Sequence, residues 1–201
     1  MLVLYILAIK ISEIRKEISK SDYIKKITEL KKLPDLIKKT LECQDQIQII
    51  AKDFLLAKGA MFLGRGLSFP IALEGALKLK ELSYLHAEGY PAGEMKHGPL
   101  ALIEEGLPVV ILAPKDKYFE KTISNMQEVI ARGGKVILLT NEKNKIISEN
   151  VRFTLELPKT DDYLTPFLMA IPLQLLAYHV ASLKNCDIDK PRNLAKSVTV
   201  E

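Results

Sequence analysis

The sequence predicts an α/β fold, a three-layer αβα sandwich with a mainly parallel, doubly wound sheet that is preceded by helices. Residues 108–113 and 135–140 are continuous apolar runs bounded by turn residues, a pattern typical of strands buried on both faces. Residues 118–132, between these runs, are apolar at helical period and end at Gly133 and Gly134. A strand, a helix and a strand in this order need a right-handed crossover, so we expect the two strands to be parallel.

The same patterns place the remaining elements. We expect helices over residues 2–18, 22–39, 43–57, 70–85 and 163–183 and strands over residues 60–63 and 151–157. Proline should break the second helix at Pro34 and interrupt the last one at Pro166 and Pro172. No strand follows closely enough to cover Leu2 and Leu4, so the first helix needs an apolar partner elsewhere.

Composition narrows the class of protein. The chain has 201 residues with 48% apolar residues and mixed charges, which is typical of one soluble globular domain with flanking helices. A net charge of +4, with lysines interleaved among acids, gives no indication of nucleic-acid binding. Lys10 ends the apolar N-terminal run well short of the roughly 20 residues that span a bilayer, so no membrane segment is expected there. Cys43 and Cys186 stand far apart without ligand spacing, so neither a metal nor a cofactor is expected and a reduced, cytoplasmic setting is the simplest interpretation.

Three positions could carry acid, base or amine chemistry. Glu74, Lys78 and Glu81 follow one another at i, i+4 and i+7, so one helix face presents an acid, an amine and an acid, although a surface salt-bridge row has the same spacing. His97 stands in a turn-rich loop after this helix and Lys196 in the C-terminal tail, where each could equally be a solvated residue. Imidazole titrates near neutrality, which suits proton exchange between two oxygens.

Glycines after the first strand could form a phosphate site at a helix N-terminus, with Gly64, Arg65, Gly66 and Ser68 as the candidate residues. The signal is weak, because residues 64–68 lack the third glycine of a dinucleotide fingerprint and the Lys-Ser/Thr of a nucleotidase loop. Glu88 and Glu94 are further candidates for lining a site, with solvated loop acids as the alternative. His86 and His179 lie in stretches that we interpret as apolar and helical, and both are expected to be structural.

Residues 64–81, residues 93–99 and the closing run 191–201 together resemble the sugar-isomerising half of glutamine:fructose-6-phosphate aminotransferase, also called glucosamine-6-phosphate synthase. The resemblance extends from about residue 33 to the last residue. It implies the fold of a sugar isomerase (SIS) domain and a reaction in which fructose 6-phosphate and ammonia from glutamine give glucosamine 6-phosphate.

The resemblance also implies roles for single residues. Glu81 corresponds to the general base and Lys78 to its polar neighbour, His97 to the group that opens the sugar ring, and Lys196 to the amine that forms a Schiff base with the sugar ketone. The histidine of the family reaches into the site of the neighbouring subunit, which implies a homodimer. The implied substrate-binding residues are Gly64, Arg65, Gly66, Ser68, Glu74 and Ala195.

The match is incomplete in two respects. The family binds the sugar phosphate mainly through a loop rich in serine and threonine in its first isomerase domain, whereas residues 114–117 offer no hydroxyl cluster. The glutaminase part, with its N-terminal cysteine nucleophile, has no counterpart. The resemblance therefore divides the chain into the helical end of a preceding SIS domain with a linker (residues 1–40), a second SIS domain (residues 41–190) and a catalytic tail (residues 191–201). Alone, such a chain would hold half of an active site and would need the first isomerase and glutaminase domains in cis or in trans.

Two other functions remain compatible with the sequence. A glutamine-independent sugar-phosphate isomerase or deaminase would need a phosphate site built from residues 64–68 and the dimer partner. A non-catalytic sugar-phosphate-binding or dimerisation module would need no base, so the presence together of Glu81, His97 and Lys196 argues against it.

Overall fold

The computed structural model describes residues 1–142 and 151–194 and contains one sheet of five parallel strands. The strands are β1 (Gly59–Gly64), β2 (His86–Pro91), β3 (Pro108–Leu112), β4 (Lys135–Thr140) and β5 (Phe153–Glu156). Their spatial order is β2-β1-β3-β4-β5, so the chain leaves β1 first to one side of the sheet and then to the other. The loops after β1 and β3 diverge at this reversal, which is where open parallel sheets usually bind ligands.

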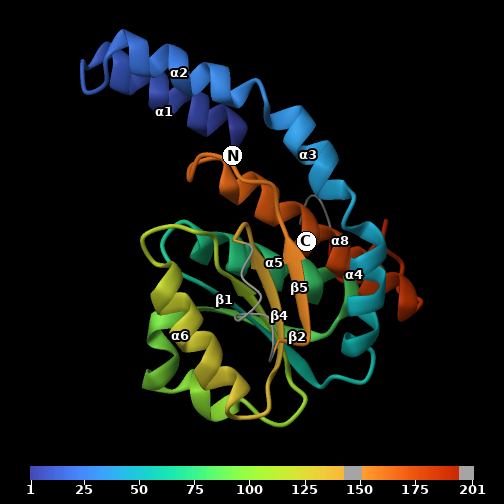
Figure 1. Ribbon diagram of the computed structural model, residues 1–201. Coiled ribbons are helices and arrows are strands. Elements are labelled where there is room, and N and C mark those ends of the chain that lie inside the picture. Colours follow the sequence, from blue (N-terminus) through green and yellow to red (C-terminus); the bar gives the residue numbers. More distant parts are fainter. Residues whose placement is uncertain (143–150, 195–201) are drawn as a thin grey trace, which may run out of the picture.

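Helices cover both faces of the sheet and form the expected three layers (Figure 1). One face carries α4 (Gln44–Ala51), α5 (Ser68–Ser83) and α8 (Thr165–Leu183), and the other carries α6 (Phe119–Ile130) and the 3₁₀ segments η2 (Ala92–His97) and η3 (Pro99–Leu102). Alternate strand residues supply the two cores, as shown by Phe62 and Val110 on the α5 side and Leu63 and Ile111 on the α6 side. The doubly wound sandwich predicted from the apolar runs is therefore confirmed.

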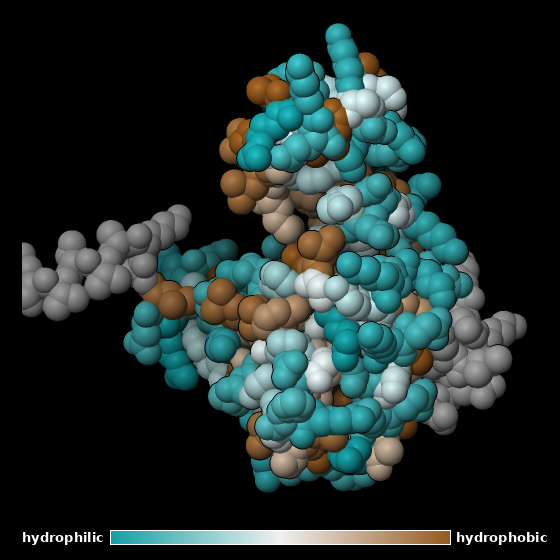
Figure 2. All heavy atoms as spheres, turned by 90° about the vertical axis from the view of Figure 1, so that its left-hand side faces the viewer, coloured by the Kyte–Doolittle hydropathy of each residue, from teal (hydrophilic) through white to brown (hydrophobic). Residues whose placement is uncertain are grey.

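The N-terminal helices lie outside the sandwich. Helices α1 (Leu2–Ile14) and α2 (Lys20–Leu30) form an antiparallel pair that projects beyond it, and α3 (Leu33–Leu41) leads back to α8 and then to α4 and the short segment η1 (Lys52–Phe54) (Figure 1). Pro34 is near the start of α3, so the predicted break between two helices is confirmed. Figure 2 shows apolar side chains exposed on the projecting pair. In α1, Leu4 is 70% exposed and Leu7 is 53% exposed.

Two sequence predictions about helices need correction. Pro172 does not interrupt the last helix, because α8 continues through it while Pro166 occupies its first turn. An internal proline costs a helix about 3 kcal/mol, but α8 is buried against α5 and α4, and this packing outweighs the lost hydrogen bond. In composition and length α8 could span a membrane, yet here it is a core helix of the sandwich.

The second correction concerns His86. The helix expected over residues 70–85 ends at Ser83, and His86 begins the edge strand β2 with its side chain 75% exposed, so His86 is neither helical nor a core residue. The segment His86–Pro91 mixes charged, apolar and glycine residues without a regular alternation, so the sequence pattern did not predict this strand. His179, by contrast, is buried in α8, as expected of a structural histidine.

Candidate active site

The polar row expected on one face of α5 is present in the structure. Lys78 Nζ donates a hydrogen bond to Glu81 Oε2 over 2.7 Å and lies 3.9 Å from Glu74 Oε1. The Glu81 hydrogen bond raises the pKa of Lys78, so the ammonium stays charged at neutral pH. The Lys78 and Glu81 side chains are 32% and 26% exposed, which leaves the pair accessible to a molecule in solution.

The opposite face of α5 fixes the orientation of this row. Ala72, Ala76 and Leu79 are buried between the sheet and α8. Gly75 permits the close approach, because a Cβ atom there would lie 2.6 Å from Leu173 Cδ1. A helix held this tightly on its buried side cannot rotate, so the row on its other side has a defined direction.

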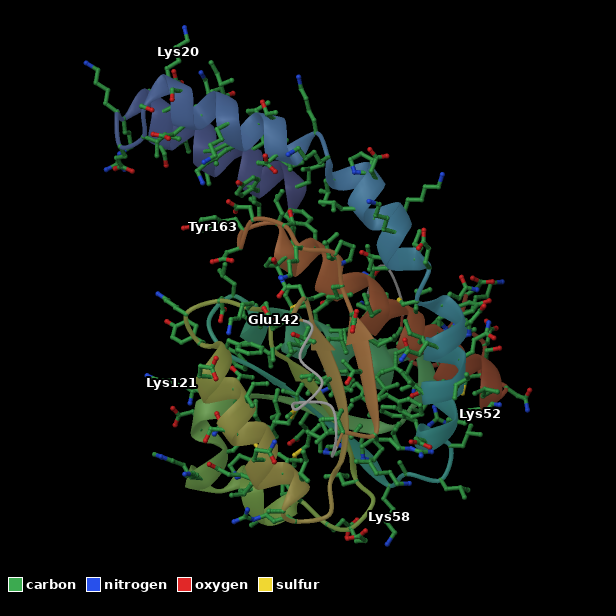
Figure 3. All side chains as sticks on the ribbon, in the orientation of Figure 1. Lys20, Lys52, Lys58, Lys121, Glu142 and Tyr163 are labelled. Atoms are coloured by element: carbon green, nitrogen blue, oxygen red, sulfur yellow. The ribbon has the colours of Figure 1, made fainter. Side chains whose placement is uncertain are left out.

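The far end of α5 lies at the amino edge of the sheet. Helix α5 returns from the end of β1, and two residues after Tyr84 the chain enters β2 at His86, which pairs with Gly59 at the start of β1. Lys58, labelled in Figure 3, marks this edge. Glu81 is thus near the amino edge, opposite to the loops that follow β1 and β3.

The C-terminal segment returns to the same place. The Arg192 backbone N–H donates to Tyr84 Oη over 2.8 Å, and the Arg192 guanidinium lies over the Tyr84 ring at 4.1 Å from its centroid. Cys186 Sγ lies 4.0 Å from the Ser83 carbonyl oxygen. The last described residues are therefore attached to the end of the helix that carries Glu81. Sequence analysis missed Tyr84, since a tyrosine after an amphipathic helix carries no signal of its own.

His97 is held in a different layer. Segment η2 covers the sheet face opposite to α5, and the His97 side chain is 74% exposed with its Nδ1 3.8 Å from Glu94. Lys96, its neighbour, pairs with Glu128 of α6 over 3.0 Å. Among the described residues no hydrogen bond or ion pair links His97 to Glu81, so one copy of the chain does not bring these two candidates together.

Arg65 helps to hold η2 in place. Its Nε donates to Asn125 Oδ1 of α6 over 3.3 Å, and its guanidinium lies against Gly93, where a Cβ atom would come within 2.6 Å of Nη2. The side chain of this candidate substrate-binding residue is therefore directed toward α6 and η2.

A cavity of about 480 Å³ lies at the carboxyl edge of the sheet, where the strand order reverses. Its lining residues come from the starts of α5 and α8 and from the loop after β3: Gly66, Leu67, Ser68, Pro114, Asp116, Lys117, Tyr118, Asp162, Tyr163, Thr165 and Pro166. Tyr163, labelled in Figure 3, lies at the start of α8 on this side of the molecule. Ser68 is buried and its hydroxyl donates to the Met169 sulfur over 3.8 Å.

The structure distributes the remaining candidates unevenly. Gly66 and Ser68 line the cavity, whereas Gly64 and Arg65 do not, and Glu74 belongs to the polar row. Ser68 and Glu81 are thirteen positions apart on one helix, a rise of about 20 Å, so the cavity and the polar row are distinct places on α5. Lys196 and Ala195 lie outside the described residues. Within residues 1–142 and 151–194, no three His, Cys, Asp or Glu side chains are grouped as a metal site would require.

Comparison with known proteins decides the family. The family model of the SIS domain matches residues 54–184, which include the whole sheet, α5 and α8 on one face and α6 on the other. The chain belongs to the SIS domain family. The resemblance inferred from the three motifs is thereby confirmed, and so is the fold that it implied.

Two curated relatives and one solved structure are similar to this SIS chain over nearly all of its length. The chain is 49% identical over 198 residues to the glutamine-fructose-6-phosphate aminotransferase (isomerizing) of Aquifex aeolicus, covering 98% of this chain and 32% of the relative. The protein of that name from Bradyrhizobium diazoefficiens is 51% identical over 202 residues, covering 100% of this chain and 33% of the relative. The structure of the C-terminal domain of glucosamine-fructose-6-phosphate aminotransferase from Francisella tularensis is 43% identical with a TM-score of 0.87, covering 93% of this chain and 53% of that one. The chain thus spans about a third of the length of these curated relatives.

Proposed function

We propose that the chain is the C-terminal isomerase part of a glutamine:fructose-6-phosphate aminotransferase, which converts fructose 6-phosphate and glutamine-derived ammonia to glucosamine 6-phosphate. The observation that carries this proposal is the Lys78–Glu81 pair on a rigidly packed α5, in a chain half identical to proteins of that name. The product is an amino sugar, so the reaction would feed amino-sugar biosynthesis.

Glu81 serves as the general base in this proposal. Conversion of a ketose imine to an aldose amine moves a proton between C1 and C2, and one carboxylate can take the proton from one carbon and return it to the other. The charged Lys78 ammonium, 2.7 Å from the Glu81 carboxylate, can stabilise negative charge that develops on the enolamine.

Lys196 forms the Schiff base in this proposal. Its neutral amine adds to the C2 ketone of the open-chain sugar, and water leaves as the imine forms. Ammonia then replaces the lysine at C2, which frees the Lys196 amine and gives the ketose imine on which Glu81 acts. A lysine with a reference pKa of about 10.4 is neutral in roughly one molecule in a few thousand at pH 7. The assembled site must therefore lower that pKa by desolvation or by a neighbouring cation.

His97 opens the sugar ring in the site of a second copy. Its exposure, and its place on the sheet face opposite to α5, support a homodimer in which each imidazole serves the Glu81 of the other subunit. The proposed division is the end of a preceding SIS domain (residues 1–40), a second SIS domain (41–190) and a catalytic tail (191–201). In this proposal the main phosphate-binding loop and the source of ammonia belong to a first isomerase domain and a glutaminase domain outside this chain. We propose that the whole enzyme is cytoplasmic.

Borohydride trapping tests the proposal. The chain is incubated with fructose 6-phosphate, reduced with borohydride and analysed by mass spectrometry, with Lys196→Ala as the matched control. An adduct on Lys196 that is absent from the control is the expected result. If this chain forms no adduct while the Aquifex aeolicus relative is labelled under the same conditions, the proposal that Lys196 of this chain forms the Schiff base is contradicted.

The cavity at the carboxyl edge favours a second candidate, a glutamine-independent sugar-phosphate isomerase or a non-catalytic sugar-phosphate-binding module. Ser68 and Thr165 are buried hydroxyl residues in its lining, and Gly66 and Lys117 join them there. Turnover of fructose 6-phosphate with ammonium alone would support the isomerase. Binding without turnover, lost in Ser68→Val and unaffected by Glu81→Gln, would support the binding module.

A further inference from the structure

His97 combines an exposed side chain with a backbone that is fixed on both sides. It is the last residue of η2, and most of its side chain is open to solvent. Met95, two positions earlier, is buried in the core between the sheet and α6. Gly98, directly after it, has φ 149° and ψ −56°, a conformation that other residues rarely adopt. The imidazole therefore stands on a rigid support, unlike a histidine of a loose surface loop.

An ion pair joins η2 to α6 directly beside His97. Lys96 Nζ lies 3.0 Å from Glu128 Oε1, and the Glu128 side chain is only 21% exposed. The other carboxylate oxygen, Oε2, is buried and has no hydrogen-bond partner among the described residues. Burial of an unpaired polar atom costs free energy, so Glu128 is poorly suited to a role in stability alone. The segment that it holds offers a better explanation of its presence.

Arg65 attaches the start of the same segment. Its Nε donates to Asn125 Oδ1 over 3.3 Å, and its guanidinium lies so close to Gly93 that a Cβ atom there would come within 2.6 Å of Nη2. Asn125 and Glu128 are three positions apart on α6 and therefore share one face of that helix. This face of α6 attaches η2 near both of its ends, at Gly93 through Arg65 and at Lys96 directly.

We propose that Glu128 is a positioning residue that holds Lys96, and with it the imidazole of His97, at a defined place on the surface. This inference rests on the proposed function, in which His97 opens the sugar ring. Lys96 and His97 are adjacent in the chain, so the ion pair restricts the backbone that carries the imidazole. Glu128 acts through His97 and does not touch the sugar.

Ring opening explains why the position of the imidazole matters. The bond between C2 and the ring oxygen breaks, the C2 hydroxyl gives up its proton as the ketone forms, and the ring oxygen accepts a proton. One imidazole can transfer this proton only within hydrogen-bond distance of the two oxygens. A displacement of about 1 Å can lower the rate of such a step by about a hundredfold. Loss of the ion pair should therefore affect the rate of reaction more than the affinity for the sugar.

Two substitutions at Glu128 and one matched control test the inference. Glu128→Ala removes the acceptor for Lys96, whereas Glu128→Gln keeps an amide oxygen that can still accept a hydrogen bond from it. Glu120→Ala is the control, because Glu120 also pairs with a lysine, Lys115, over 3.1 Å, but at the other end of α6. Each substitution is made in this chain and in a chimera in which this chain replaces the matching segment of the Aquifex aeolicus relative.

Hydrogen exchange of the peptide segment 92–97 measures the attachment of η2 in this chain. Glu128→Ala should speed exchange there about two- to tenfold, the factor for one hydrogen bond. Glu128→Gln should give a smaller change, and Glu120→Ala should give none. The midpoint of thermal unfolding should change little in Glu128→Gln, because the amide carries no charge that burial must desolvate.

The rate of glucosamine 6-phosphate formation by the chimera measures the positioning. In Glu128→Ala, kcat should fall about five- to fiftyfold, because displacement of a proton donor costs more than the lost contact, while the KM for fructose 6-phosphate stays nearly constant. Glu128→Gln should recover part of the rate. His97→Asn alone should lower kcat about a hundredfold or more. Addition of Glu128→Ala to His97→Asn should lower it no further, because no imidazole is left to position.

Three outcomes would overturn the inference. Unchanged exchange of residues 92–97 in Glu128→Ala would mean that the ion pair does not hold η2. Faster exchange with an unchanged kcat, or an equal further loss of kcat in the His97→Asn background, would mean that Glu128 does not act through His97. If His97→Asn leaves kcat unchanged while exchange still depends on Glu128, the proposed role of His97 fails, and Glu128 has a structural contact alone.

Discussion

The two faces of α5 differ in what they contribute to the molecule. The buried face, with Ala72, Gly75, Ala76 and Leu79, joins the sheet to α8 and is closed to solvent. The opposite face presents a row of charges that remain partly exposed. Burial of a side chain such as Leu79 is worth about 2 to 3 kcal/mol, whereas an accessible ion pair is worth about 1 kcal/mol or less. One helix therefore separates stability from chemistry, and changes on one face should leave the property of the other intact.

The largest expected effect is loss of catalysis without loss of stability. The test uses a chimera in which this chain replaces the matching segment of the Aquifex aeolicus relative. In the chimera, Glu81→Gln should lower glucosamine 6-phosphate formation by about 10²- to 10⁴-fold, because an amide cannot accept and return a proton as a carboxylate does. The midpoint of thermal unfolding should hardly move. Lys80→Gln, on the same helix but outside the row, is the control and should keep a rate of the same order. Equal losses of activity in both variants would contradict the assignment of Glu81 as the general base.

The buried face should give the converse result. Leu79→Ala is expected to lower the free energy of unfolding of the isolated chain by about 2 to 5 kcal/mol, because the cavity adds to the lost burial. Leu77→Ala, at a position that is 40% exposed, should cost about 1 kcal/mol or less. Denaturant unfolding of both variants measures the difference. Similar losses would show that the two faces are not energetically distinct.

The two faces should also respond differently to pH. Burial lowers the pKa of His179, which belongs to α8 on the buried side and whose Nε2 has no hydrogen-bond partner among the described residues. His179 therefore takes up a proton more readily in the unfolded chain than in the folded one. The free energy of unfolding should fall as the pH drops below about 6.5, by up to about 1.4 kcal/mol per pH unit. The fall should end once the pH is below the lowered pKa of His179 in the folded chain. The raised pKa of Lys78 has the opposite sign, so its contribution is complete throughout this range and is lost only in strong alkali.

Unfolding measured between pH 5 and pH 8 checks this prediction. His179→Gln should remove much of the acid slope, whereas the same change at the exposed His97 should keep it. An unaltered slope in His179→Gln would assign the acid sensitivity to carboxylates.

The smallest effect is expected within the row itself. Glu74 is 3.9 Å from Lys78, so Glu74→Gln should change the free energy of unfolding by about 0.5 kcal/mol at most. The difference should shrink further in high salt. A loss above about 2 kcal/mol at low salt would mean that the row is structural, which would weaken its assignment to chemistry.

Local patterns were sufficient for much of this molecule. The two apolar runs on either side of residues 118–132 predicted β3, α6 and β4. Strands that are buried on both faces are continuous apolar runs, which are easy to recognise in a sequence. The spacing of Glu74, Lys78 and Glu81 predicted a shared helix face, since 3.6 residues per turn brings these positions together in any helix.

The chain's own sequence thus determined its fold class, its family and the polar row on α5. Each of these depends on residues close together in the sequence or on a contiguous sequence motif. Tertiary structure alone decided the rest. Helix α8 runs through Pro172 because burial outweighs a local penalty, and His86 enters an edge strand because β1 offers a free partner. His97 and Glu81 are in different layers, and Tyr84 meets Arg192, because contacts between residues distant in sequence arise only from the way the whole chain packs.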